Sequence, residues 1–333
     1  MSRCDESELS SQLRVFSGSS HPELAREITD YLGCELSPSL TKRFSNDDLY
    51  VQLGVSVRAK AVVIIQSLCS PVSDNIIEML MMVDAARSAS ATTVHVVIPY
   101  FSYGRSDKKD QPRISITARL VADLITTAGA SHVMTMTLHS PQVHGFFSIP
   151  ADHLTSHAVF VRHFRTKDLS NTVVVSPDIG HAKRATKLAR ALGVGVAAGD
   201  KERVADDRVV VAGIIGEVAN KNVILFDDEI ATGGSIVAMV DALRAEGCKR
   251  ITLACTHGVF SGNSIERLRN ICEIDEIVTT NTVPITPEKR LPNMTVLSVA
   301  PIFGEAIRRN LVGLSVGALF DFWPNPDDCV PTW

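Results

Sequence analysis

No apolar run in this 333-residue chain approaches the roughly 20 residues that a membrane-spanning helix needs. The polar and acidic start, residues 1–11, lacks the pattern of a secretory signal peptide. The seven cysteines are odd in number and include no Cys-x-x-Cys pair, which favours reduced thiols over a disulfide framework or a zinc site. A net charge of -4 argues against a general nucleic-acid binder. These absences predict a cytoplasmic protein that binds neither membranes nor nucleic acids.

What is present is typical of a globular α/β protein of about two domains. The composition, 45% hydrophobic and 21% charged, is ordinary for this class. Apolar, β-rich segments are expected as strands at 13–17, 41–44, 49–53, 61–66, 93–99, 132–137, 172–176, 194–198, 209–214, 223–226, 250–255, 277–279 and 296–298. Segments with helical spacing are expected at 22–32, 75–89, 117–128, 182–192, 236–243 and 300–309.

The stretch 223–235 is the most informative in the chain. A buried strand ends at two adjacent carboxylates, Asp227 and Asp228, and a Thr-Gly-Gly-Ser turn then leads into a helix. A glycine-bearing turn at a helix N-terminus suits a phosphate, because free N–H groups and the helix dipole face it. Carboxylates repel phosphate and need another partner, either sugar hydroxyls or a divalent cation. The stretch therefore suits a sugar phosphate, and the plain alternative is an acidic strand end before an ordinary helix cap.

Two polar segments lie at other expected strand ends. The loop 100–113 combines aromatic and cationic residues that would suit a nucleotide, although a solvated charged loop has the same composition. The charged segment 199–208 is a candidate mobile flap.

An internal repeat supports two domains. Met82-Val83-Asp84-Ala85 recurs at 239–242, each time in a helix that follows a buried strand. Where the second copy has its acidic pair, the first has Gln66 and Ser67. The first domain thus reads as a duplicate that lacks the acidic pair.

Taken in order, several motifs resemble the ribose-phosphate pyrophosphokinase family. They occupy residues 43–45, 99–100, 103–105, 138–139, 145–147, 175–178, 201–203, 227–235 and 256–262. The resemblance covers about 13–320 and implies two tandem phosphoribosyltransferase-type domains, each a mainly parallel sheet flanked by helices. We expect an N-terminal domain at 1–155, a C-terminal domain at 156–310 and a tail at 311–333.

The resemblance implies an enzyme that transfers the pyrophosphoryl group of Mg-ATP to the 1-hydroxyl of ribose 5-phosphate, giving 5-phosphoribosyl 1-pyrophosphate and AMP. It also implies a homo-oligomer based on dimers and reaching a hexamer. The ribose hydroxyls are expected at the acidic pair and the 5-phosphate at the turn, so the ribose 5-phosphate residues are Asp227, Asp228, Ala231, Thr232, Gly233, Gly234 and Ser235. Mg²⁺ is expected at His139 and Asp178, and His139 is also expected among the catalytic and ATP-binding residues.

The remaining family roles concern catalysis and ATP. Lys201 and Arg203 match the catalytic flap, whose cations would neutralise the transferring group. The expected ATP contacts, some of them across a subunit boundary, are Phe44, Asn46, Asp48, Arg105, Ser106 and Asp110. The family usually has Asp, Glu and Gln where this chain has Asn46, Asp48 and Ser106.

Two other functions fit parts of the pattern. One is a catalytically poor paralogue that assembles with or regulates a true synthetase, and its support is the set of departures from the family. The other is a phosphoribosyltransferase, which uses the same acidic loop but needs neither tandem domains nor an ATP loop.

Overall fold

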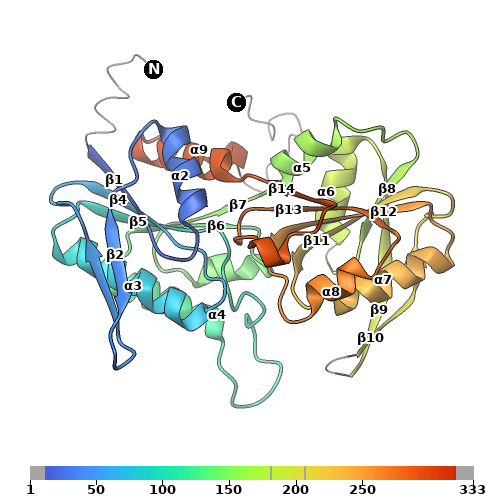
Figure 1. Cartoon of the computed structure of the whole chain (residues 1–333), viewed down its shortest axis with the longest axis horizontal. Helices are drawn as coiled ribbons and strands as arrows, with labels where there is room; N and C mark the ends of the chain where they lie inside the picture. The colour runs from blue at the N-terminus through green and yellow to red at the C-terminus, as the bar shows by residue number, and fades with distance from the viewer. Residues whose placement is uncertain (1–11, 181, 206–207, 320–333) are drawn as a thin grey trace.

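The computed structural model describes residues 12–180, 182–205 and 208–319, with only the backbone described at 201–205 and 208–211 and at Ala318. It forms two α/β lobes side by side (Figure 1). None of the described helices is long and apolar enough to cross a membrane.

The first lobe is a parallel five-stranded sheet with helices on both faces. Its strands, in spatial order, are β1 (Leu13–Ser17), β4 (Ala61–Ile65), β5 (Thr93–Ile98), β6 (His132–Met136) and β7 (Ala151–Leu154). One face is covered by α3 (Val72–Ser88) and α4 (Thr117–Ala128), and the other by α2 (Pro22–Leu32) and α9 (Ala300–Leu311). A separate antiparallel hairpin is formed by β2 (Ser39–Arg43) and β3 (Leu49–Leu53).

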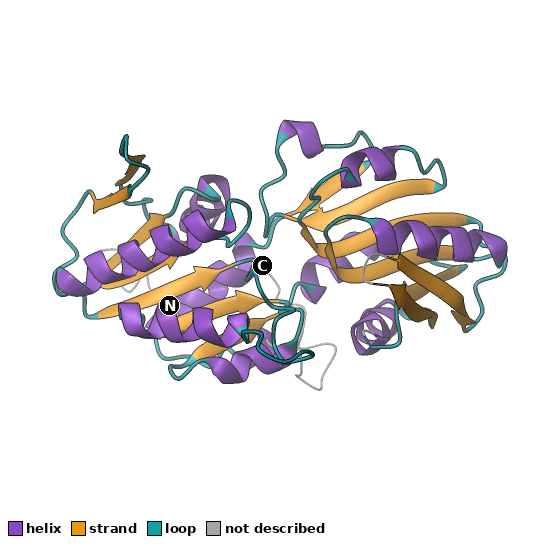
Figure 2. Ribbon diagram, turned by 90° about the horizontal axis from the view of Figure 1, so that it is seen from below, coloured by secondary structure: helices purple, strands orange, loops and turns teal. Residues whose placement is uncertain are grey.

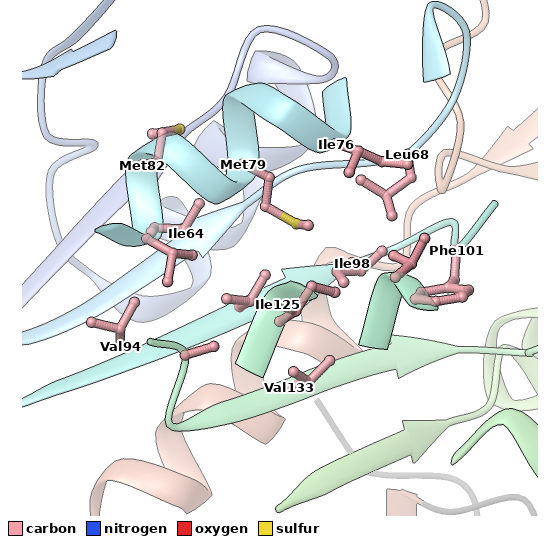
Figure 3. Close-up of a cluster of buried hydrophobic side chains, with 14 of the residues drawn as sticks. Ile64, Leu68, Ile76, Met79, Met82, Val94, Ile98, Phe101, Ile125 and Val133 are labelled. Atoms are coloured by element: carbon pink, nitrogen blue, oxygen red, sulfur yellow. The ribbon is translucent and has the colours of Figure 1, made fainter. Parts of the chain in front are cut away.

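The core of the first lobe follows from alternation along its strands. Val62 and Ile64 of β4 point to α3 and α4, whereas Val63 and Ile65 point to the opposite face. Figure 3 shows side chains of β4, β5 and β6 meeting those of α3 and α4. Met79 and Met82 of α3 are fully buried, which confirms their expected role in core packing, whereas Met81 is partly exposed. Each such side chain contributes about 1.5–3 kcal/mol through burial.

The last described α-helix, α9, belongs by packing to the first lobe. Phe303 and Ile307 of α9 lie in one buried cluster with Leu24 and Ile28 of α2. Figure 1 shows α9 beside α2. Sequence reasoning had assigned 300–310 to the C-terminal domain. We propose instead that α9 completes the N-terminal domain, since a sheet face without a cover would expose its apolar side chains.

The second lobe is a seven-stranded sheet. Its strands, in spatial order, are β10 (Arg208–Ile215), β9 (Gly195–Ala205), β8 (Thr172–Ser176), β11 (Asn222–Ile230), β12 (Arg250–Gly258), β13 (Ile274–Thr280) and β14 (Met294–Leu297). Only the β9–β10 pair is antiparallel. One face carries α5 (His157–Phe164) and α6 (Ala182–Leu192), and the other carries α7 (Gly234–Ala245) and α8 (Ser264–Arg269).

Several sequence expectations differ from the structure. The expected charged flap at 199–208 is largely strand, because β9 runs to Ala205 and pairs with β10 at the edge of the sheet. A hairpin at the edge of a sheet needs no apolar alternation, so the charged sequence of 199–205 did not indicate that β9 continues through it. The short apolar piece at 143–147 lies mostly in a 3₁₀ helix, Pro141–Phe146. β7, α5 and α8 were not anticipated.

The order of the second sheet creates a crevice. From β8 the chain runs to β9 on one side, whereas β11 lies on the other side of β8. Ligands of open α/β sheets bind at the carboxyl ends of strands where the order reverses in this way. The first sheet, in the order β1-β4-β5-β6-β7, has no such reversal. The fold therefore places one crevice in the second lobe, facing the first.

Candidate active site

A cavity of about 1060 Å³ lies where the carboxyl ends of the strands of both lobes meet. The first lobe contributes the loop after β5 and the residues after β6, and the second contributes the ends of β8 and β11 and the start of α7. Sequence-predicted residues that line it are Arg105, Asp110, His139, Asp178, Asp227, Asp228, Ala231, Thr232, Gly233, Gly234 and Ser235. Figure 2 shows the two lobes from below, with the segments that connect them.

Asp228 is buried, at 3% exposure. Its Oδ2 lies 2.7 Å from His139 Nδ1 and 3.3 Å from Arg184 Nη1. Burial raises the pKa of Asp228, but the hydrogen bond and charge of His139, with Arg184, outweigh burial and hold that pKa well below its usual range. Asp228 is therefore an ionised anchor for two cationic or hydrogen-bonding side chains.

Asp227 is half-buried, and its Oδ1 accepts a hydrogen bond from the backbone N–H of Asp228 at 2.8 Å. The strand β11 continues through both acids to Ile230, because Glu229 and Ile230 still pair with His257 and Gly258 of β12. Sequence reasoning had ended the strand before the acids. The two carboxylates have different neighbours along the strand, although both line the cavity.

The turn 231–235 leads directly into α7. Gly233 precedes the helix with φ 74°, a left-handed conformation that favours glycine. No side chain within the described chain caps this helix start, so its first N–H groups are arranged as an anion site. Arg267 of α8 donates to the carbonyl of Thr232 at 3.1 Å and holds the turn against the lobe.

In the first lobe, the residues that correspond to the acidic pair, Gln66 and Ser67 after β4, are already hydrogen-bonded within the protein. Gln66 Nε2 donates to Glu78 at 2.7 Å, and Gln66 Oε1 accepts from Ser20 at 2.6 Å. Ser67 donates to the carbonyl of Thr282 in the second lobe at 2.6 Å. The amide and hydroxyl that stand in place of the acidic pair thus make structural contacts.

The structure brings some of the residues expected to bind ATP to the cavity and leaves others away from it. Arg105 and Asp110 line the cavity, whereas Ser106 does not. The Ser106 hydroxyl donates to the carbonyl of Ser115 and accepts from the backbone N–H of Thr117, so it fixes the start of α4. The structure therefore does not bring Ser106 to the cavity.

Three further predicted residues, Phe44, Asn46 and Asp48, lie in the exposed turn of the β2–β3 hairpin and outside their own chain's cavity. Lys42 lies over the Phe44 ring, 5.1 Å from its centroid. The backbones of Lys201 and Arg203 lie in β9, but their side chains fall outside the described part of the structure.

Cavity residues that the sequence did not indicate include Arg184 and Glu229. Arg184 reaches from the first turn of α6 to Asp228 and also donates to the carbonyl of Leu138. A cation in a first helical turn opposes the helix dipole, and this mismatch was the available signal. The second residue is Glu229, the third acid in succession at the end of an apolar strand.

His257 joins the two lobes beneath the cavity. Its Nδ1 lies 2.8 Å from the Thr282 hydroxyl and its Nε2 3.1 Å from the carbonyl of Thr137. Burial lowers the pKa of His257 to about 4, so the imidazole is neutral at pH 7. Its ring centroid lies 5.1 Å from that of Tyr100.

Comparisons with known proteins show which family the chain belongs to. Residues 13–129 match the family model described as the N-terminal domain of ribose phosphate pyrophosphokinase, and residues 206–321 match the phosphoribosyl synthetase-associated domain. The ribose-phosphate pyrophosphokinase of Deinococcus radiodurans is 49% identical over 316 residues, covering 93% of this chain and 98% of that protein. This chain belongs to the ribose-phosphate pyrophosphokinase family.

Two other relatives agree with this assignment. The ribose-phosphate pyrophosphokinase of Campylobacter jejuni is 45% identical over 92% of this chain and 98% of its own. The crystal structure of phosphoribosylpyrophosphate synthetase from Mycobacterium smegmatis has a TM-score of 0.85 and 37% identity, covering 91% of this chain and 99% of that chain. The likeness to members of the family thus spans both lobes, and it confirms the resemblance inferred from the motifs.

Proposed function

We propose that this chain transfers the pyrophosphoryl group of ATP to the 1-hydroxyl of ribose 5-phosphate. The 1-oxygen attacks the β-phosphorus, the bond to the bridging oxygen of the α-phosphate breaks, AMP leaves and the hydroxyl proton is released. The observation that carries the proposal is the cavity itself. It combines an uncapped helix start beside two acids with Arg105 and His139 from the other lobe.

In this proposal the second lobe holds the sugar. The backbone N–H groups of the turn 231–235 bind the 5-phosphate, and Asp227 with Asp228 accepts hydrogen bonds from the 2- and 3-hydroxyls. The chain supplies charge neutralisation through Arg105 on the first lobe and through Lys201 and Arg203 on β9. Such positioning and electrostatic stabilisation is the main requirement of phosphoryl transfer.

The family implies Mg²⁺, and the donors of the cavity fit it. Asp178 and Asp227 offer carboxylate oxygens to one cavity, and oxygen is the ligand Mg²⁺ prefers. Among the described residues no group of three or more His, Cys, Asp or Glu could hold a metal ion alone. Mg²⁺ usually binds through one or two carboxylates, waters and substrate phosphates, so this arrangement suits Mg-ATP. When bound, the ion neutralises the triphosphate; we assign its protein contacts to Asp178 and, directly or through water, to His139.

We also propose a homo-oligomer in which a second copy supplies Phe44, Asn46 and Asp48. Their position outside their own cavity supports a shared site. Mixing two inactive variants, Phe44→Ala and Lys201→Ala, should restore activity when subunits exchange. No recovery under conditions where ultracentrifugation shows mixed oligomers would contradict the shared site.

The function itself is tested by incubating the protein with ATP, Mg²⁺ and ribose 5-phosphate and measuring AMP. We expect AMP and 5-phosphoribosyl 1-pyrophosphate in equal amounts, and no AMP when EDTA removes the metal. A protein that releases no AMP would be a poor paralogue or a phosphoribosyltransferase, and the latter would consume added 5-phosphoribosyl 1-pyrophosphate with a base.

A further inference from the structure

Glu229 reaches from the end of β11 into the first lobe. Its Oε2 accepts a hydrogen bond from the Tyr100 hydroxyl at 3.3 Å, and its Oε1 lies 3.4 Å from Arg105 Nη2. Both partners belong to the loop after β5, more than a hundred positions earlier in the sequence. One carboxylate therefore ties the strand that carries the sugar-site acids to the loop expected to meet ATP.

Glu229 lies in surroundings that destabilise a charged carboxylate, because it is largely buried. Its side chain is 10% exposed, whereas that of Arg105 is 57% exposed. Burial raises the pKa of Glu229 and the Asp228 charge adds to the rise, while Arg105, His139 and the Tyr100 hydroxyl lower it. An ion pair with a largely exposed arginine contributes little to folding, and a buried acid costs stability. Such a group at the wall of a cavity points to a role in the site.

Glu229 also stands between two cavities. It lines the main cavity and a smaller one of about 150 Å³ beside it, and Arg105 and His139 line both as well. The contact with Glu229 uses one nitrogen of the Arg105 guanidinium, whose fork carries five N–H donors. Arg105 also lines the main cavity, where its remaining donors can serve a ligand.

We propose that Glu229 is a positioning residue for the nucleotide: it holds the Arg105 guanidinium at the rim of the main cavity, where the triphosphate binds. This inference rests on the proposed function, because it takes Arg105 to meet ATP. It adds a residue of the sugar-binding lobe to the recognition of the other substrate. Glu229 thereby makes ATP affinity depend on how the two lobes sit together.

The test replaces Glu229 by Gln, which keeps the length and removes the charge. We expect the KM for Mg-ATP and the Kd for ATP from calorimetry to rise about threefold to fivefold, the range of a partly exposed ion pair. The KM for ribose 5-phosphate and kcat should stay within about twofold. Tyr100→Phe is the matched control, since it removes the other partner of the same carboxylate and keeps the charge beside Arg105.

The decisive comparison uses Arg105→Ala and the double variant. If Glu229 acts through Arg105, Glu229→Gln adds no further loss of ATP binding once Arg105 is gone. An equal loss in both backgrounds, unchanged ATP binding in the single variant, or an equal rise in both KM values would overturn the inference. A wild-type protein that binds ATP but makes no AMP would overturn the proposed function alone, because the coupling is measured by binding.

Discussion

His139 Nδ1 lies 2.7 Å from a carboxylate oxygen of Asp228, and this contact joins the two lobes at the wall of the cavity. A histidine from the end of β6 and an acid of β11 are thus set against each other by the meeting of two sheets. Arg184 completes the group on the side of α6. The geometry ties the proposed sugar site to a residue of the lobe that faces ATP.

Replacing Asp228 by Asn should raise the KM for ribose 5-phosphate by about tenfold or more and affect the KM for ATP much less. The amide keeps the size of the side chain but loses the charge and one acceptor oxygen. Steady-state kinetics with each substrate varied in turn measures both constants. Asp241→Asn, an exposed acid on α7, is the matched control and should change neither. Equal rises in both constants would count against the sugar assignment.

Lys201→Ala should lower turnover at least about 100-fold, because the variant loses a cation proposed to stabilise the transferring group. The Tm should change little, since position 201 lies where β9 has run past its pairing with β8 and pairs with β10. Turnover and thermal unfolding are measured on the same preparation, beside Lys249→Ala, which removes an exposed lysine elsewhere in the lobe. Turnover equal to that of the control would remove Lys201 from the mechanism.

Arg184→Met should destabilise the protein by on the order of 3 kcal/mol, because it leaves the buried Asp228 carboxylate without one of its cationic partners. Urea unfolding gives the free energy of unfolding for the wild type and the variant. Arg190→Met changes an exposed arginine on the same helix and should cost less than about 0.5 kcal/mol. A cost for Arg184→Met as small as that of the control would show that Asp228 does not depend on Arg184.

Stability should fall as the pH is lowered from about 6.5 toward 4, partly through His95. Burial, with the nearby charge of His132, lowers the pKa of His95 to about 4 from its ordinary value of 6.5, while Asp152 opposes this shift. Since the unfolded state binds the proton more readily, the stabilisation is complete above 6.5 and lost by about 4. The full effect is at most about 3 kcal/mol, at 1.36 kcal/mol per unit.

Urea unfolding at several pH values measures this dependence, and His95→Gln should show a shallower fall than the wild type between 6.5 and 4. His257 has its pKa lowered to about 4 as well and keeps part of the slope in the variant. An identical slope in both proteins would contradict the role of His95.

Much of the fold could be predicted from the sequence, because the hydrophobic periodicity and the helix-capping residues indicate the same elements. Helix Pro22–Leu32 begins at a proline and ends before Gly33 in a left-handed conformation, and its predicted bounds are confirmed. The repeat at 82–85 and 239–242 lies in α3 and α7, where its methionine and valine are buried in both copies. In these helices the local sequence pattern and the packing of the core favour the same structure.

The site was less predictable, since its contacts are made between lobes. Nothing near Asp228 in the chain indicates that Arg184 and His139 meet it, and Glu229 gave no periodic signal. The continuation of β9 through 199–205 was missed for a related reason, because it depends on pairing with β10 and its charged sequence shows no apolar alternation. Sequence spacing records local structure, while these features depend on how distant segments pack.

The packing of α9 on the first sheet also affects the order in which the two lobes can complete their folding during synthesis. On the ribosome, the first sheet is synthesised early, whereas Phe303 and its neighbours are synthesised only after the strands of the second lobe. Until then α2 alone covers that face of the sheet, and the part that packs against α9 stays exposed. The first lobe therefore completes its core only after the second lobe has been synthesised, and removal of α9 would destabilise the first lobe.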